Sequence, residues 1–182
     1  KKILINIVLL FFITSNVNAH ISHYKNFKKI EMEIFLNNRL IGYNYYFFKI
    51  DKDITLITNQ IKFTVKVLGA TIFEVEGYGE EKYNKDKLIS FNSRTKQNKK
   101  EKFVNLKLDK KNDEFMIKGS SYTGKAATNN VVGNWWNHKL LQVESQISPI
   151  SGSIKKQIIT FIAKEKIKLY GKNFDTEHFK LK

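Results

Sequence analysis

Three glutamates have the type and spacing for acid–base chemistry or for binding a hard cation. Glu74, Glu76 and Glu80 share one face of a segment that alternates like a β-strand. Such carboxylates can act as general acid and base, or as oxygen ligands. They can equally be exposed partners of lysines on neighbouring strands. Ile72 and Tyr78 share that face and leave its exposure open, and we favour the exposed ion pairs.

The histidines and the missing cysteines narrow the chemistry further. The four histidines are His20, His23, His138 and His178, and none forms an H-x-x-H or H-E-x-x-H pair. A metal site would require His138 and His178 to meet in space, and we expect them to be unrelated. The chain has no Cys, which excludes disulfides, thiolate zinc sites, iron–sulfur clusters and cysteine nucleophiles. We therefore predict no metal and no cofactor.

Two short motifs match enzyme signatures in spacing only. Residues 119–125 fit the G-x-x-x-x-G-K pattern of a phosphate loop, but Ala126 follows where a Ser or Thr would bind Mg²⁺. Residues 153–156 fit the S-x-x-K pattern of penicillin-recognising enzymes, but the companion S-D-N and K-T-G motifs are missing. We interpret both as turns, and we predict no catalytic residue.

The most unusual local sequence is Trp135-Trp136-Asn137-His138. Indoles beside amides can stack on sugar rings or lie at a lipid interface. They can also plug the open end of a sheet, which we favour. In an extended segment the two indoles point to opposite faces, so that one can be core and the other exposed. These four residues, together with Phe63 and Val65, are the candidate ligand or partner site.

The elements that would position these residues are β-strands. Residues 61–67 alternate apolar and polar side chains, as do residues 30–34, and residues 40–50 form an aromatic-rich run typical of a central strand. Short polar turns separate further expected strands at 54–68, 71–83, 88–93, 103–108, 114–118, 158–163, 166–170 and 174–181. Residues 119–130 are expected to be a loop, and 140–147 a strand or a short helix. Gly77 and Gly79 predict a bulge or sharp curvature.

This pattern predicts a mainly β fold, a curved antiparallel meander that forms an open half-barrel or barrel-like sheet. Alternating apolar positions at Ile61, Phe63, Val65 and Val67 would line a groove on its concave face. The last expected strand ends with the chain, which suggests that a C-terminal hairpin is lacking.

The N-terminus reads as an export signal. Two lysines precede an apolar run over residues 3–13, and Val17 and Ala19 fit a cleavage site. We expect residues 1–19 to be a signal peptide and residues 20–182 to be a single periplasmic domain. The alternative is an uncleaved anchor at the inner membrane. No Cys follows the cleavage point, so a lipid-modified N-terminus is excluded.

The chain is strongly basic, with 32 Lys+Arg against 17 Asp+Glu and a formal net charge of +15. The charge has two interpretations. It can attract the chain to an anionic membrane surface or an acidic polymer. It can also be an ordinary solvated lysine-rich face, which we favour. Nucleic acid is a poor partner for an exported protein.

The order of three features resembles a family of uncharacterised, exported β-rich proteins of Gram-negative bacteria, classed as a domain of unknown function. The features are Leu40-Ile41-Gly42 after a tight turn, Trp136-Asn137-His138 after the meander, and residues 147–152 before the final strands. The resemblance covers most of residues 30–182. It implies a half-barrel similar in outline to periplasmic lipoprotein carriers, with a further hairpin at the C-terminus and no known activity.

Three function hypotheses follow. The first is a non-enzymatic periplasmic binding module for a lipid or other apolar envelope component. The second is a structural or assembly protein that docks on another envelope protein through Trp135-Trp136 and an unpaired strand edge. The third, and the weakest, is an enzyme that uses Glu74, Glu76 or His138.

Overall fold

The protein is mainly β in the computed structural model, which describes residues 24 and 26–182. The expected signal peptide lies outside the described residues, as do His20 and His23. The elements in chain order are β1 (Lys29–Leu36), β2 (Arg39–Asp51), β3 (Ile54–Val67), β4 (Ala70–Asn84), β5 (Lys87–Gln97), β6 (Lys100–Asp109), β7 (Glu114–Gly119), β8 (Thr123–Ala127), β9 (Val131–Val132), the 3₁₀-helix η2 (His138–Gln142), β10 (Ser145–Ile147), β11 (Ile154–Lys156), β12 (Ile159–Leu169) and β13 (Lys172–Leu181).

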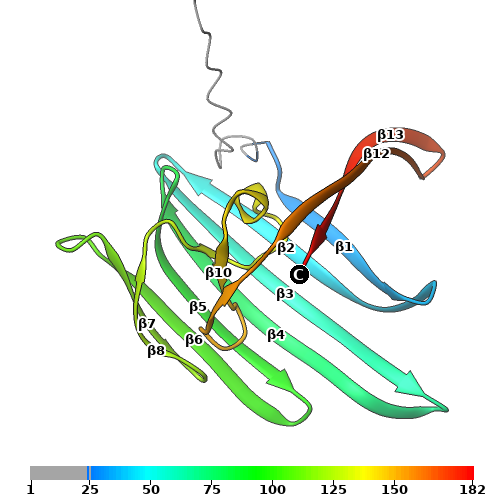
Figure 1. Cartoon of the computed structure of the whole chain (residues 1–182), viewed down its shortest axis with the longest axis horizontal. Coiled ribbons are helices and arrows are strands. Elements are labelled where there is room, and N and C mark those ends of the chain that lie inside the picture. Colours follow the sequence, from blue (N-terminus) through cyan, green and yellow to red (C-terminus); the bar gives the residue numbers. More distant parts are fainter. Residues whose placement is uncertain (1–23, 25) are drawn as a thin grey trace, which may run out of the picture.

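The first eight strands form one open antiparallel meander in the order β1 to β8, which confirms the expected fold class (Figure 1). No closed barrel is formed by the strands that the structure describes. Each strand pairs with its sequence neighbour because short turns connect them, as in β2–β3 around Lys52 and β4–β5 around Lys85. Within residues 24 and 26–182, no helix is long and apolar enough to cross a membrane.

The period-2 alternation of the strands separates two faces of this sheet. One face carries a continuous row of facing residues across the central strands: Phe48, Ile57, Glu81, Phe91, Leu106 and Ile117. All six are buried. The other face, called the outer face below, carries charged rows such as Lys62, Glu76 and Lys96.

Residues 128–157, called the insert below, lie on the buried face of the sheet. The insert contains β9, η2, β10 and β11, and it forms a small three-stranded sheet of its own in the order β11–β10–β9. Two contacts mark its border: the Tyr46 hydroxyl accepts from the backbone N–H of Trp135, and the Ser93 hydroxyl donates to the carbonyl of Pro149. The buried face is therefore named the insert face.

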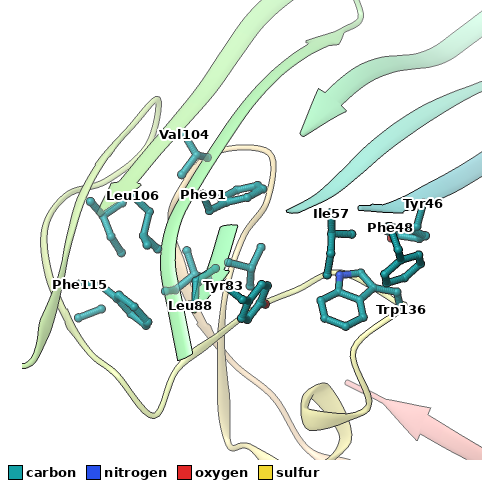
Figure 2. Packing of buried hydrophobic residues seen from close by; sticks show 14 of the residues in the cluster. Tyr46, Phe48, Ile57, Tyr83, Leu88, Phe91, Val104, Leu106, Phe115 and Trp136 are labelled. Atoms are coloured by element: carbon teal, nitrogen blue, oxygen red, sulfur yellow. The ribbon is translucent and has the colours of Figure 1, made fainter. Parts of the chain in front are cut away.

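The hydrophobic core lies between the sheet and the insert. Val132, Trp136 and Ile147 of the insert belong to the same cluster of buried side chains as the inward-facing residues of β2 to β8. Figure 2 shows Trp136 between Tyr83 on one side and Ile57 and Phe48 on the other. This packing removes large aromatic surfaces from water, which is the main stabilising term for such a sheet.

The C-terminal strands β12 and β13 pair with each other as a separate two-stranded sheet. Facing pairs such as Ile167–Phe174 lie on one side of this hairpin, and Lys164–Glu177 and Lys166–Asp175 on the other. The hairpin exposes several large apolar side chains, among them Phe161, Leu169 and Phe174.

Three local expectations were wrong. The expected loop at 119–130 contains strand β8, and the two strands expected at 158–163 and 166–170 are one strand, β12, with an irregularity between Phe161 and Ala163. Gly77 and Gly79 lie in regular pairing, and the irregularities fall at Val65/Lys66 and Lys82/Tyr83 instead. Gly77 makes room for a neighbour, since a Cβ there would lie 2.9 Å from the Thr95 hydroxyl oxygen.

Candidate functional site

A buried carboxylate fastens the insert to the sheet. Glu81 of β4 is 2% exposed and faces the insert. Its Oε1 accepts hydrogen bonds of 2.7 Å from the side-chain amide of Asn134 and from the indole N–H of Trp136, and its Oε2 accepts one of 2.5 Å from the Tyr83 hydroxyl. All three donors are neutral. Burial therefore raises the pKa of Glu81 and is the dominant effect, although the three hydrogen bonds lower it.

Tyr83 belongs to the same cluster. It faces Thr55 and Leu88 across the strands and turns its hydroxyl to Glu81. Burial raises the pKa of Tyr83 well above its ordinary value, and the nearby carboxylate raises it further. Tyr83 is therefore a neutral donor at every physiological pH.

A second polar cluster holds the insert at β2. The Asn44 side chain donates to the Tyr46 hydroxyl at 2.9 Å, and Trp135 donates its backbone N–H to the same hydroxyl at 3.2 Å. Burial raises the pKa of Tyr46 to about 12. A buried hydroxyl with two such partners fixes the path of the backbone at Trp135, because leaving any of these groups unpaired is costly.

Tyr24 covers the other side of Trp136. Its ring stacks on Phe48 with centroids 5.5 Å apart and meets Trp136 edge-on at 5.3 Å. Its hydroxyl donates to the Trp136 carbonyl at 2.5 Å and lies 3.0 Å from Nδ1 of His138. Tyr24, Phe48 and Tyr83 thus surround Trp136 with aromatic rings, and the indole is a structural plug.

A hollow of about 660 Å³ lies beside this plug, between the β4–β5 turn and the insert. Its volume is in the range of small-molecule sites, about 300–1,000 Å³. Its apolar walls are Tyr83, Leu88, Phe115, Val131, Val132 and Val143. Its polar lining includes Asn84, Asp86, Thr128, Asn129, Asn130, Asn137 and Gln142.

Three lysines also line the hollow: Lys85, Lys87 and Lys139. Lys87 forms an ion pair of 2.5 Å with Asp113 of the β6–β7 turn. Lys85 extends from the β4–β5 turn, and Lys139 from η2, so that positive charge borders an apolar floor from two sides. This arrangement suits a ligand with an apolar body and an acidic or polar end.

The structure separates the predicted site residues into two places. Asn137 lines the hollow and Trp136 lies directly behind it, whereas Trp135 is 62% exposed. Phe63 and Val65 share the insert face, as expected, but they lie on the far half of β3. Phe63 is eight residues beyond Thr55, the partner of Tyr83, which corresponds to roughly 26 Å along a strand.

The other chemistry candidates form no site. Glu76 lies on the outer face and pairs with Lys62 at 3.3 Å. Lys125 of the phosphate-loop match pairs with Glu114, and the Ser153 motif leads into strand β11 rather than a helix. His138 contacts Tyr24, whereas His178 pairs with Glu165 at 2.8 Å in the C-terminal hairpin. Within residues 24 and 26–182, no group of three or more acidic or histidine side chains could hold a metal ion.

Sequence reasoning missed the buried carboxylate. Glu81 lies on the same face of β4 as Val75 and Tyr83, which are apolar and aromatic. An acidic residue among such neighbours on one face of a strand is the signal that could have revealed the buried carboxylate.

An open antiparallel meander that carries an insert on one face, with a hollow where the insert meets the β4–β5 turn, defines a β scaffold whose candidate site is a binding hollow. The chain belongs to the family described as a domain of unknown function, DUF6134, whose model matches residues 32–182. No curated protein and no solved structure matches the chain.

Proposed function

We propose that this chain is a non-enzymatic, exported binding protein for a lipid or another partly apolar component of the bacterial envelope. The observation that carries the proposal is the hollow between the β4–β5 turn and the insert, with an apolar floor and three lysines in its lining. An acyl chain or ring system would lie against Leu88, Phe115 and Val132, and an acidic head group would meet Lys85 and Lys139.

The architecture of the walls supports binding rather than catalysis. Glu81, the buried acid whose partner Tyr83 lines the hollow, is occupied by three donors and is 2% exposed, which keeps it from reaching a ligand. Its role is to hold Asn134 and Trp136, and with them the wall formed by Asn137.

The test is native mass spectrometry of the exported chain, with organic extraction of any bound species. We expect a co-purified amphiphile in the parent chain and its loss in Val143→Trp, which fills the hollow. Leu141→Trp is the matched control, because Leu141 is similarly half-buried two residues away and does not line the hollow. The proposal would be refuted if the parent chain carried no ligand, or if both variants carried equal amounts of ligand.

One observation favours a second candidate, an assembly protein that docks on another envelope protein. Trp135 is 62% exposed in a segment where Asn134, Trp136 and Asn137 are buried. An exposed indole on a fixed backbone is a typical anchor of a protein interface. Affinity purification from envelope extract would then recover a partner that Trp135→Ala loses and Met116→Ala, another exposed apolar position, retains.

A further inference from the structure

Two hairpin turns place a bulky apolar or aromatic residue in the left-handed region. Among the described residues, nine non-glycine residues have positive φ; four of them are Asn or Asp, which tolerate this conformation, and three are Lys, whose polar side chain stays in water. The remaining two are Leu68 at φ +50° and Tyr170 at φ +49°. Both side chains are fully exposed. A bulky apolar residue in the left-handed region is strained, and in water it gains nothing from burial.

Leu68 does not stand alone at its end of the sheet. Alternate turns of a meander lie at the same end, so the β3–β4 turn lies beside the β1–β2 turn. The two turns together expose six large apolar side chains: Phe35, Leu36, Leu40, Val67, Leu68 and Ile72. In Figure 1 both turns, and the β12–β13 turn with Tyr170, lie at the right-hand end of the long axis. These three turns are called the apolar tips below.

Charge differs between the two ends of the sheet. We count each turn with the three strand residues on either side of it. The turns β1–β2, β3–β4 and β5–β6 then carry six basic residues and one acid, a net charge of +5: Arg39, Lys66, Lys96, Lys99, Lys100 and Lys102 against Glu101. The opposite turns, β2–β3, β4–β5 and β6–β7, carry eight basic residues and six acids, a net charge of only +2: Lys49, Lys52, Lys82, Lys85, Lys87, Lys107, Lys110 and Lys111 against Asp51, Asp53, Asp86, Asp109, Asp113 and Glu114.

We propose that the apolar tips are a docking surface for an anionic lipid bilayer. Separate apolar tips can each enter the boundary between head groups and acyl chains, while the flanking lysines meet lipid phosphates. A second copy of this chain is a poorer occupant, because it would bring the same positive charge to the contact. The proposal is independent of the ligand in the hollow, which lies beside the β4–β5 turn at the other end of the sheet.

The strained turn offers a variant that separates binding from folding. Asn37 and Asn98 adopt the same left-handed conformation in the two neighbouring turns of this end. Leu68→Asn therefore places a favoured residue in the turn and removes an exposed apolar side chain. We expect a higher melting temperature and, in the same protein, weaker binding to vesicles.

The experiment is co-sedimentation of residues 20–182, which include every described residue, with vesicles of phosphatidylglycerol and phosphatidylethanolamine. Vesicles of pure phosphatidylcholine are the uncharged comparison. We expect binding to the anionic vesicles only, weakened by salt. Leu68→Asn should reduce the partition coefficient roughly tenfold, the scale expected for one lost Leu side chain.

A matched pair of charge insertions completes the design. Leu36 at the tips is 44% exposed and Met116 on β7 is 43% exposed. Leu36→Asp should release the chain from anionic vesicles, and Met116→Asp should not. Val143→Trp should bind vesicles like the parent chain, which separates this surface from the ligand hollow. Equal binding of Leu68→Asn and the parent, equal binding to phosphatidylcholine, or a tip-dependent dimer that ignores vesicles would overturn the proposal.

Discussion

Replacing Glu81 by glutamine tests how the insert is held on the sheet. Glu81 accepts three hydrogen bonds from neutral donors and has no basic partner among them. In Glu81→Gln, the side-chain oxygen can still accept from Asn134 and Trp136. The new amide group can donate to the Tyr83 hydroxyl, which can reverse its role. The glutamine thus reproduces the protonated carboxyl group in shape and hydrogen bonding.

The pH dependence has a definite sign. Burial raises the pKa of Glu81 in the folded chain above its value in the unfolded chain. Between these two pKa values the folded state holds the proton and the unfolded state does not, so stability falls as pH rises. The stability contributed by the protonated group is fully present below the unfolded pKa, near the ordinary Glu value of 4.5, and is lost as pH rises through the folded pKa. Glutamine cannot ionise and escapes this loss.

Glu81→Leu is the contrasting variant. It leaves the amide of Asn134, the indole N–H of Trp136 and the Tyr83 hydroxyl buried without their acceptor, at about 1–3 kcal/mol each. We therefore expect a loss of roughly 3–9 kcal/mol in the free energy of unfolding at neutral pH. For Glu81→Gln we expect a change within about 1 kcal/mol at acid pH. Its stability relative to the parent should then increase as the pH rises above 4.5.

The assay is guanidinium unfolding of the parent and both variants between acid and neutral pH, followed by tryptophan fluorescence. Differences between variant and parent cancel the other titrating groups. A Glu81→Gln variant that loses several kcal/mol at neutral pH, with a loss that shrinks as the pH falls, would refute the reasoning. It would show that the charged carboxylate itself holds the insert.

Three further predictions use the same unfolding assay or a simple activity screen. Trp136→Phe keeps one aromatic ring but removes the N–H donor to Glu81 and part of the buried indole, and should lose at least about 1–3 kcal/mol; a loss near zero would contradict the role of that hydrogen bond. Gly119→Ala should loosen the insert, because its Cβ would lie 2.5 Å from the Ser151 carbonyl oxygen, and increased proteolysis of the insert would show it. Glu76→Gln should change stability by less than about 0.5 kcal/mol and alter no activity in a hydrolase screen, since its ion pair is exposed; a clear effect on either would revive the enzyme hypothesis.

In the C-terminal hairpin, the structure differs from what the local sequence pattern predicts. The strands expected at 158–163 and 166–170 leave Lys164 and Glu165 between them, yet both residues lie inside β12. Charged residues argue against a strand only where the face that carries them must be buried. On this exposed hairpin, Lys164 faces Glu177 and Lys166 faces Asp175, so charge supports the pairing.

The meander itself was determined by the sequence alone. Period-2 alternation, polar turns and a chain without long helical periodicity leave few alternatives to consecutive antiparallel strands, since these signals are local. The same local rule put Ile61, Phe63 and Val65 on one face, as the structure shows. Val67, the fourth residue expected to line that face, is 51% exposed near the end of the strand. Trp135 is exposed and Trp136 is buried, but both lie in a turn and not in the extended segment that the rule assumed.

Only the tertiary structure decided which face of β4 is buried, and therefore which glutamate of this strand, Glu81, is the buried carboxylate. Both faces of that strand carry apolar side chains, with Ile72 and Tyr78 on one and Val75 and Tyr83 on the other. The choice depends on where the insert, some 50 residues later in the chain, folds back. That contact encloses Glu81 and creates the hollow. Because burial and hydrogen bonding across such a distance are nonlocal, no pattern within the strand could reveal them.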